Sequence, residues 1–520
     1  MKKILLFLIL LLALTSQAQT LKDSVSIAET LEGKQLWGKS LSLDKRIVKV
    51  MPQDTLVGIV SCDTTKKGKN TEKGYLRVLN AKTMQTYWDR SLDFSISIPH
   101  CMTRYGMLVT SKMKDKNKAL LTMFDMKSGK SLWTQYLHPV FVNDTLDIVI
   151  GLAEIGSSQT LAYRLHDGMF LWRNEIPMTK NIGWNKAKML DSTHLVVMGD
   201  NLNEIDITTG KMWKMKAKYG KYDTTGMLSL ALMNITSVAL SFGLNLSTVT
   251  VFYNLNPYTI TNLGSNVLLG DSTFYVTDRE NFYCLSNDSL QLQWKYAFPK
   301  NVASTAQLMM RDGKVYMLNY GYGESLMRGR VLCGKPFLAV FDASSRNIVR
   351  YTPLYDAKHI MHDGMLTDKG VYLAGGDKAV FLSLQDSAVH VVDWKTKGNG
   401  ALKVVLQQKP LYGFHGDVHQ LTKIEASADV CPMETDKKKC FLFDSNLKVL
   451  EQYELGETFD VCFEAGDVVC LQNREDSSNC WLAHRDGTPI AHMKWKPNLL
   501  FLCGNHAFVV YDKSVASMKM

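Results

Sequence analysis

The chain repeats one pattern of apolar and polar positions. An apolar strand ends in Asp or Asn, a polar turn follows, and a second strand closes on Trp, as in FDMKSGKSLW ending at Trp133 and YRLHDGMFLW ending at Trp172. Further copies end at Trp213 and Trp294, and weaker ones recur at intervals of about 40 to 55 residues. Alternating β-branched and aromatic residues bounded by Asp, Asn and Gly are typical of β-strands. The pattern therefore predicts an all-β chain of repeated hairpins, with two further strands between most copies.

A repeated hairpin unit cannot bury its apolar face alone, so neighbouring copies must stack. A repeat of about 40 to 50 residues is the length of one four-stranded blade of a β-propeller. We therefore expect residues 19–520 to form a single propeller of about eight to ten four-stranded blades. Residues 32–39 supply a closing strand with no complete blade before it, and no closing strand is evident after Phe508–Tyr511. We expect these two segments to pair in one shared blade that closes the ring, because an open ring would leave an exposed strand edge.

The residues that recur in each copy have structural explanations. An Asp at an inter-strand turn accepts hydrogen bonds from the backbone that follows it, and a repeated Trp packs between blades more often than it binds a ligand. We expect the first role for the turn residues Asp125, Asp167, Asp206, Asp342, Asp444 and Asp486.

Residues 1–18 have the pattern of a secretory signal peptide. Two lysines precede an apolar run from Ile4 to Leu14, and small residues follow up to a cleavage point after Ala18. The apolar run is too short for a membrane-spanning helix. No cysteine lies near the cleavage point, so the sequence does not indicate a lipid anchor. The sequence thus predicts a periplasmic or secreted protein with no transmembrane segment in the mature chain.

The net charge argues against a nucleic-acid partner. The formal charge of +10 falls to +8 when Lys2 and Lys3 leave with the signal peptide. The remaining lysine excess is spread along the chain without a basic cluster, as on an ordinary solvated surface.

All ten cysteines lie in the mature part of the chain, in a compartment that permits disulfides. Two pairs, Cys431 with Cys440 and Cys470 with Cys480, flank polar turns and are candidates for disulfides across hairpins. The alternative is that each cysteine is a small buried hydrophobic residue. No CxxC spacing occurs, so the sequence carries no zinc signature.

The copies with an Asp turn followed by GKxLW, best seen at Trp133, resemble the repeat of the quinoprotein-like propeller family. That family includes quinone-dependent alcohol dehydrogenases and a non-catalytic propeller lipoprotein of outer-membrane barrel assembly. The dehydrogenases carry an adjacent Cys-Cys pair, which this sequence lacks, and no calcium-binding set can be transferred residue by residue. The resemblance to the non-catalytic branch therefore implies the scaffold and no cofactor.

One segment departs from the repeat. Residues 226–243 are uncharged, follow the helix-capping residues Asp223, Thr224 and Thr225, and place apolar residues such as Leu232 at helical spacing. We expect an inserted apolar helical segment over 223–247 that packs on the propeller. Docking onto a partner or lipid surface and a pair of buried strands are the alternatives.

Two further stretches contain residue types suited to ligands. The loop NYGYGESLMRGR could hold a sugar or peptide by ring stacking and charge-assisted bonds through Asn319, Tyr320, Tyr322, Glu324, Arg328 and Arg330. In HGDVH, strand spacing would let His415, Asp417 and His419 converge on one divalent metal ion. HIMHD, with His359, His362 and Asp363, is a weaker candidate, and the favoured interpretation of both histidine stretches is an ordinary surface loop beside glycine and aspartate turns.

No convergent catalytic set accompanies the repeats. The sequence has no GxSxG, Walker loop or HExxH. The favoured function is that of an exported, non-enzymatic propeller that scaffolds or binds an envelope protein or glycan. A quinone-dependent or metal-assisted enzyme on the same scaffold, using His415, Asp417 and His419, is the alternative.

Overall fold

The computed structural model consists of β-strands, turns and irregular segments, and contains no helix among the residues that it describes. These residues are 21–113, 118–154, 157–176, 184, 186–223, 241–246, 249–254, 259–325, 328–354, 363–367, 369–375, 378–386, 388–394, 402–405, 410–414, 421–427, 430–435, 439–503 and 505–519. The all-β prediction is confirmed.

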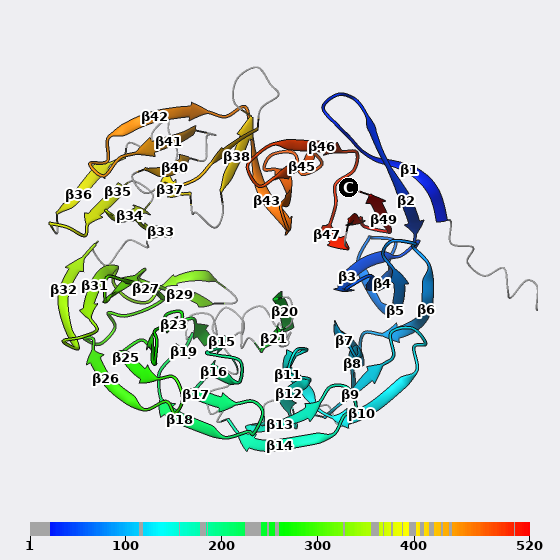
Figure 1. Cartoon of the computed structure of the whole chain (residues 1–520), viewed down its shortest axis with the longest axis horizontal. Helices are drawn as coiled ribbons and strands as arrows, with labels where there is room; N and C mark the ends of the chain where they lie inside the picture. The colour runs from blue at the N-terminus through cyan, green and yellow to red at the C-terminus, as the bar shows by residue number, and fades with distance from the viewer. Residues whose placement is uncertain are drawn as a thin grey trace, which may run out of the picture.

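Strand pairing divides the described residues into ten successive four-stranded antiparallel blades, arranged around a common centre (Figure 1). Blades 1 to 3 are β3 (Arg46–Gln53), β4 (Leu56–Thr64), β5 (Asn70–Asn80), β6 (Thr86–Asp93); β7 (Ser97–Thr103), β8 (Gly106–Lys112), β9 (Ala119–Phe124), β10 (Ser131–Tyr136); and β11 (His138–Asn143), β12 (Ile148–Leu152), β13 (Gln159–Arg164), β14 (Phe170–Glu175). Blades 4 to 6 are β15 (Lys186–Met189), β16 (His194–Met198), β17 (Asn201–Asp206), β18 (Met212–Lys216); β23 (Leu268–Leu269), β24 (Thr273–Thr277), β25 (Asn281–Ser286), β26 (Leu292–Ala297); and β27 (Ala306–Arg311), β28 (Lys314–Asn319), β31 (Phe337–Asp342), β32 (Asn347–Pro353).

The remaining four blades follow the same order, with the last one completed from the N-terminus. Blades 7 and 8 are β33 (Asp363–Leu366), β34 (Gly370–Gly375), β35 (Lys378–Ser383), β36 (Val389–Asp393); and β37 (Leu402–Val404), β40 (Cys431–Thr435), β41 (Lys439–Phe443), β42 (Val449–Glu454). Blades 9 and 10 are β43 (Glu457–Ala465), β44 (Val468–Asn473), β45 (Cys480–His484), β46 (Pro489–Met493); and β47 (Leu499–Cys503), β48 (His506–Val510), β49 (Ser514–Lys519), β2 (Gln35–Ser42). The number of blades lies at the upper end of the predicted range.

Four additions extend this repeat. β1 (Leu21–Glu29) pairs with β2 and reaches β46 of blade 9 through Ala28 and Glu29. A separate sheet, called here the added sheet, consists of β19 (Lys221–Tyr222), β22 (Thr259–Thr261), β29 (Tyr322–Ser325) and β30 (Gly329–Leu332). Two hairpins pair with the first strands of blades: β20 (Ser241–Leu246) and β21 (Val249–Asn254) with β11, and β38 (Leu411–Phe414) and β39 (Leu421–Ile424) with β43.

The terminal segments share blade 10, but the predicted partner strand is wrong. β2 pairs with β49, in the register Gly38↔Met518 to Ser42↔Ser514, and β48 lies one strand further in. The sequence predicts no closing strand after HAFVVYD, since the following segment, KSVASMK, has no Trp. That segment forms the third strand, so the N-terminus supplies the fourth.

Apolar side chains fill the space between neighbouring blades. Phe508 and Val510 of blade 10 pack with Val57, Ile59 and Leu79 of blade 1 in one buried cluster. Comparable clusters join blades 3 and 4 and blades 9 and 10. Each blade packs between two neighbours, so both faces of its sheet must be apolar. This explains why the middle strands are apolar at nearly every position.

The repeated Trp packs against the turn of the next blade, as predicted. The indole N–H groups of Trp88, Trp133 and Trp172 donate to the backbone carbonyls of Met126, Leu165 and Ile207, at 2.8, 2.7 and 2.8 Å. A Cβ added at Gly129, Gly168 or Gly210 would lie within 2.8 Å of the ring of Trp88, Trp133 or Trp172, respectively. Each of these glycines also has a positive φ, so the turn requires glycine both for its backbone conformation and for the ring beside it.

A second side chain completes each of these contacts. Two residues after the Trp, Arg90, Gln135 and Asn174 donate to the carbonyls of the same three glycines at 2.9, 2.9 and 2.7 Å. We call the Trp, the donor two residues later and the glycine of the next blade a Trp latch. Three Trp latches join blades 1 to 4.

The turn aspartates cap their turns. Asp125 Oδ1 accepts hydrogen bonds from the Ser128 hydroxyl and from the backbone N–H groups of Ser128 and Lys127. The hydroxyl bond, together with the backbone bonds, holds the pKa of Asp125 below its usual value. Similar bonds from the following backbone reach the other predicted residues, Asp167, Asp206, Asp342, Asp444 and Asp486. Their predicted structural role is confirmed.

The two candidate disulfides are not formed, and all four cysteines are buried free thiols. Cys431 lies opposite Phe443 and Cys440 lies opposite Glu434, so the two thiols point to opposite faces of blade 8. Cys470 and Cys480 share one face of blade 9, but their direct partners are Leu482 and Gln472, which leaves the thiols diagonal to each other. The Cα atoms of diagonal neighbours lie about 7 to 8 Å apart, beyond the roughly 4.4 to 6.8 Å usual across a disulfide.

The expected inserted helix does not extend to residue 247. Residues 241–246 form β20, whose Phe242 pairs with Tyr253 of β21. Residues 224–240 lie outside the described residues, so a helix there stays a prediction. Asp223, the expected cap, is described and is buried at the end of β19.

One buried acid makes the stability of the fold depend on pH. Glu204 of β17 is 0% exposed on the face of blade 4 toward blade 5, and burial raises its pKa to about 7, with Asp288 and Asp191 adding to the shift and His194 opposing it. The folded protein therefore binds a proton that the unfolded chain releases near pH 4.5. Stability should fall by up to about 3 kcal/mol between these two pKa values as pH rises.

Glu204→Gln tests this dependence, because the amide is neutral at every pH. In urea unfolding at pH 5 and pH 8, the variant should lose less stability between the two pH values than the parent protein, and should exceed it at pH 8. The exposed Glu72→Gln is the control and should behave as the parent. An unchanged slope in Glu204→Gln would contradict the prediction.

Candidate functional site

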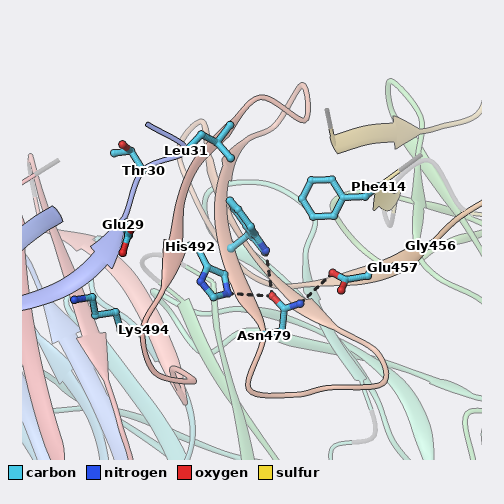
Figure 2. Close-up of a pocket in the computed structure, with 10 residues that line it drawn as sticks. Glu29, Thr30, Leu31, Phe414, Gly456, Glu457, Asn479, His492 and Lys494 are labelled. Carbon is cyan, nitrogen blue, oxygen red and sulfur yellow. Dashed lines mark hydrogen bonds between the residues drawn. The ribbon is translucent and has the colours of Figure 1, made fainter. Parts of the chain in front are cut away.

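An open cleft of about 610 Å³ lies at one end of blade 9. At this end β43 and β45 begin and β44 and β46 finish, so the cleft receives side chains from several strands at once. The tip of the β1–β2 hairpin and the end of β38 form its other walls (Figure 2). The lining residues are Glu29, Thr30, Leu31, Phe414, Gly456, Glu457, Asn479, Trp481, His492 and Lys494. We call it the Trp481 cleft.

Aromatic rings form the apolar part of the Trp481 cleft. The ring of Phe414 meets Trp481 edge-on, with centroids 5.5 Å apart, and His492 lies 4.9 Å from Trp481 on a tilted plane. Phe414 also packs on Phe459, which is fully buried in the core of blade 9. The half-buried Trp481 is therefore held in place by packing while it lines the cleft.

A hydrogen-bonded network fixes the polar part (Figure 2). Asn479 Oδ1 accepts from Trp481 Nε1 at 3.1 Å and lies 3.2 Å from His492 Nε2, while Asn479 Nδ2 donates to Glu457 Oε2 at 3.0 Å. The indole N–H is thus occupied, so Trp481 offers a ligand only its ring. Asn479 and Glu457 each have further hydrogen-bonding capacity.

Charges of both signs stand at the rim of the Trp481 cleft. Glu29 lies at the end of β1, where it accepts a hydrogen bond from Gln35 Nε2 at 2.6 Å, and Lys494 follows β46. The backbone N–H of Lys494 donates to the carbonyl of Ile27 at 3.1 Å, which ties this wall to the β1–β2 hairpin. The cleft can therefore bind a ligand of little net charge by ring stacking and several hydrogen bonds.

The sequence contains one sign of this cleft that the repeat pattern does not reveal. Trp481 belongs to the third strand of its blade, whereas the repeated Trp residues belong to the closing strand. A Trp out of register with the repeat cannot form a Trp latch. Its other partners, Glu29 and Phe414, lie far away in the sequence, so no local pattern could bring them together.

The structure places most of the predicted ligand-binding residues in structural roles. Asn319 is fully buried, where its side chain accepts from the Ser304 backbone and donates to the carbonyls of Val302 and Lys335. Arg328 forms an ion pair with the buried Asp223, which also accepts a hydrogen bond from Ser325. These contacts fix β29, β30 and Asp223 of the added sheet to one another.

The other four predicted residues lie on the added sheet or beside it. The Tyr320 hydroxyl donates to Gln307 at 2.8 Å, and the guanidinium of Arg330 lies 4.6 Å from the ring centre of the buried Tyr322. Glu324 is exposed and lies near Lys186, whose pKa is lowered by burial and partly restored by the Glu324 charge. The expected open loop is thus the hairpin β29–β30, and whether its exposed residues bind a ligand stays a prediction.

The predicted metal ligands His415, Asp417 and His419 lie outside the described residues, as do His359 and His362. Asp363 begins β33. Residues 415–420 connect Phe414 to Leu421, which pair across the β38–β39 hairpin, and Phe414 lines the Trp481 cleft. Within the part of the chain that the structure describes, no group of three His, Cys, Asp or Glu is placed to hold a metal ion. The metal site therefore stays a prediction.

The described residues include no helix long and apolar enough to cross a membrane. No protein-family model matches the sequence, and a search of curated proteins finds no significant match.

Among solved structures, the fold is similar to that of BamB from Moraxella catarrhalis, with 11% identity, 82% of this chain and 98% of that chain covered, and a TM-score of 0.32. The C-terminal WD40 domain of Sif2 has 9% identity, covers 96% of this chain and 99% of its own, and gives a TM-score of 0.30. The dihydro-heme d1 dehydrogenase NirN has 10% identity, coverage of 84% and 78%, and a TM-score of 0.30. Similarity at this level identifies neither a family nor a function for the chain.

Proposed function

We propose that the chain is an exported, non-enzymatic β-propeller of the quinoprotein-like kind that binds a glycan of the cell envelope in the Trp481 cleft. The observation that carries the proposal is the half-buried Trp481 ring, fixed by packing and by a hydrogen bond, in a cleft of about 610 Å³. The signal peptide pattern of residues 1–18 supports export to the periplasm or beyond. The GKxLW repeat supports the quinoprotein-like kind.

The chemistry of the Trp481 cleft suits a sugar better than a strongly charged ligand. A sugar ring presents one face of C–H groups and a rim of hydroxyls. The C–H face can stack on Trp481, while Asn479 and Glu457 can exchange hydrogen bonds with the hydroxyls. Two carboxylates, of Glu29 and Glu457, and one ammonium group, of Lys494, line the cleft, so its net charge is small and slightly negative.

Replacing Trp481 with a smaller residue should weaken binding strongly without unfolding the protein. We expect Trp481→Ala to weaken retention on a glycan array at least about tenfold, because stacking on an aromatic ring contributes roughly 1 to 3 kcal/mol where it has been measured for flat ligands. Trp481→Leu should weaken it similarly while keeping an apolar contact with Phe414. The melting temperatures of both variants should confirm that the fold persists.

The matched control is Trp495→Ala, which removes a Trp that is 48% exposed outside this cleft. It should bind as the parent protein does. No retention of the parent on the array, or undiminished retention of both Trp481 variants, would refute the glycan proposal. Replacing Leu31 with a photoreactive residue that then crosslinks to an envelope protein would point instead to a protein partner.

A further inference from the structure

A second, smaller cavity of about 110 Å³ lies where the added sheet meets blade 5 and the connection to blade 6. Lys221 reaches it from β19, Arg279 and Glu280 from the turn between β24 and β25, and Lys300 with Asn301 from the segment after β26. Cys333 closes the remaining side. At about 30 Å³ per water molecule, the cavity has room for an ion the size of phosphate. We call it the Arg279 pocket.

Positive charge dominates the Arg279 pocket. Three cations line it against one carboxylate, Glu280. That carboxylate already accepts a hydrogen bond from Lys218 Nζ at 2.5 Å, so a fourth cation offsets its charge. Arg279 Nε is buried without a hydrogen-bond partner, and its nearest carboxylate oxygen, on Glu280, lies 4.0 Å away. A buried donor without an acceptor is costly, and an anion in the pocket would supply the acceptor.

The turn that carries Arg279 is held rigidly. The fully buried Asp278 accepts hydrogen bonds from the backbone N–H groups of Lys218, Glu280 and Asn281 and from the Tyr283 hydroxyl. Its carboxylate is therefore directed into the turn and is not among the groups that line the pocket. The position of Arg279 is set before any ligand binds.

The thiol in the Arg279 pocket does not compete for these cations. Burial raises the pKa of Cys333 above its usual value, although Lys221 opposes the shift. The thiol is thus neutral at physiological pH, and the cations have no thiolate partner.

We infer that the Arg279 pocket binds a tetrahedral oxyanion, either free phosphate or sulfate or the phosphoryl or sulfate end of a larger ligand. The guanidinium of Arg279 supplies directional donors, which suit the oxygens of such a group. Lys221 and Lys300 add charge from two sides. The pocket is separate from the Trp481 cleft, with which it shares no lining residue.

Titration calorimetry with sodium phosphate on the whole mature protein, in chloride buffer, tests this site. Saturable binding of one phosphate per chain is expected. Arg279→Gln should weaken it at least tenfold, and Lys300→Gln, which alters an exposed side chain, should weaken it several-fold without affecting the fold. The control Lys216→Gln removes an exposed lysine of β18 outside the pocket and should leave the affinity unchanged.

Two further titrations separate the sources of the oxyanion. Sulfate should bind at the same site. Glucose 6-phosphate tests whether the pocket binds the phosphoryl end of a larger ligand. Tighter binding of glucose 6-phosphate than of phosphate would indicate a larger ligand, and weaker binding a free anion. Absence of saturable binding of every probe, an unchanged affinity in both pocket variants, or an equal loss in Lys216→Gln would overturn the inference.

Discussion

Replacing Trp133 with alanine should lower the free energy of unfolding by about 3 to 5 kcal/mol, the cost of truncating a large buried aromatic side chain. Trp133 is 8% exposed, donates to the Leu165 carbonyl at 2.7 Å and packs against the turn glycine Gly168 of the next blade. The loss of stability therefore has two causes, the cavity left by the ring and the Leu165 carbonyl left without its hydrogen-bond donor. Urea unfolding of the parent and variant measures it.

Trp37 provides the matched control for this experiment. It occupies the closing strand of blade 10, as Trp133 does in blade 2, but it is 57% exposed. Trp37→Ala should change the free energy of unfolding by less than about 1 kcal/mol, as is usual for exposed sites. Gly168→Ala should destabilise like Trp133→Ala, because the added Cβ would lie 2.8 Å from the Trp133 ring. Equal effects at Trp37 and Trp133 would contradict the role given to the Trp latch.

Deleting residues 21–42 should lower the melting temperature by roughly 5 °C or more, since each kcal/mol corresponds to about 2 to 4 °C in a large domain. The deletion removes β1 and β2, and with them Ile27, Ala28 and Leu41 from two buried clusters. It also exposes the edge of β49, which favours association with other chains. Differential scanning calorimetry measures the first effect and light scattering the second.

Two point variants refine the test of the terminal strand. In Gly38→Val the new side chain would collide with the Ser517 carbonyl oxygen, which would lie 2.3 Å from the added Cβ, and with Ile27. Lys39→Val introduces the same residue one position further along β2, where the Lys39 side chain is 44% exposed. We expect only Gly38→Val to destabilise strongly. Similar melting temperatures for the parent, the deletion and Gly38→Val would show that β2 is dispensable.

Local repetition explains which parts of the fold the sequence could predict. The Asp turn and the closing Trp recur within about ten residues of each other, so the pattern at Trp133 or Trp172 was enough to identify a blade and the role of its Trp. β49 lacks the closing Trp of the repeat, and the sequence therefore places the partner of β2 one strand too early. The hairpin β29–β30 looked like an open loop because its partner strand, β22, lies about sixty residues away.

The Trp481 cleft could not be predicted for the same physical reason. Its walls come from residues 29 to 31 and from residues between 414 and 494, and only the stacking of blades brings them together. The candidate residues that the sequence did suggest, such as Asn319 and Arg328, have polar side chains that a ligand could use. In the structure these side chains satisfy buried backbone groups and Asp223 instead.

The pairing of β2 with β49 also constrains the order of folding. Gly38 is made 480 residues before its partner Met518, so blade 10 cannot form until that whole stretch has emerged. Contacts this distant in sequence slow folding, and large chains expose apolar surface in the meantime. Until β49 has been made and blade 10 has formed, the faces of blades 1 and 9 that pack against blade 10 stay exposed. We therefore expect blades 1 and 9 to need protection from aggregation for the longest time, although they lie far apart in the sequence.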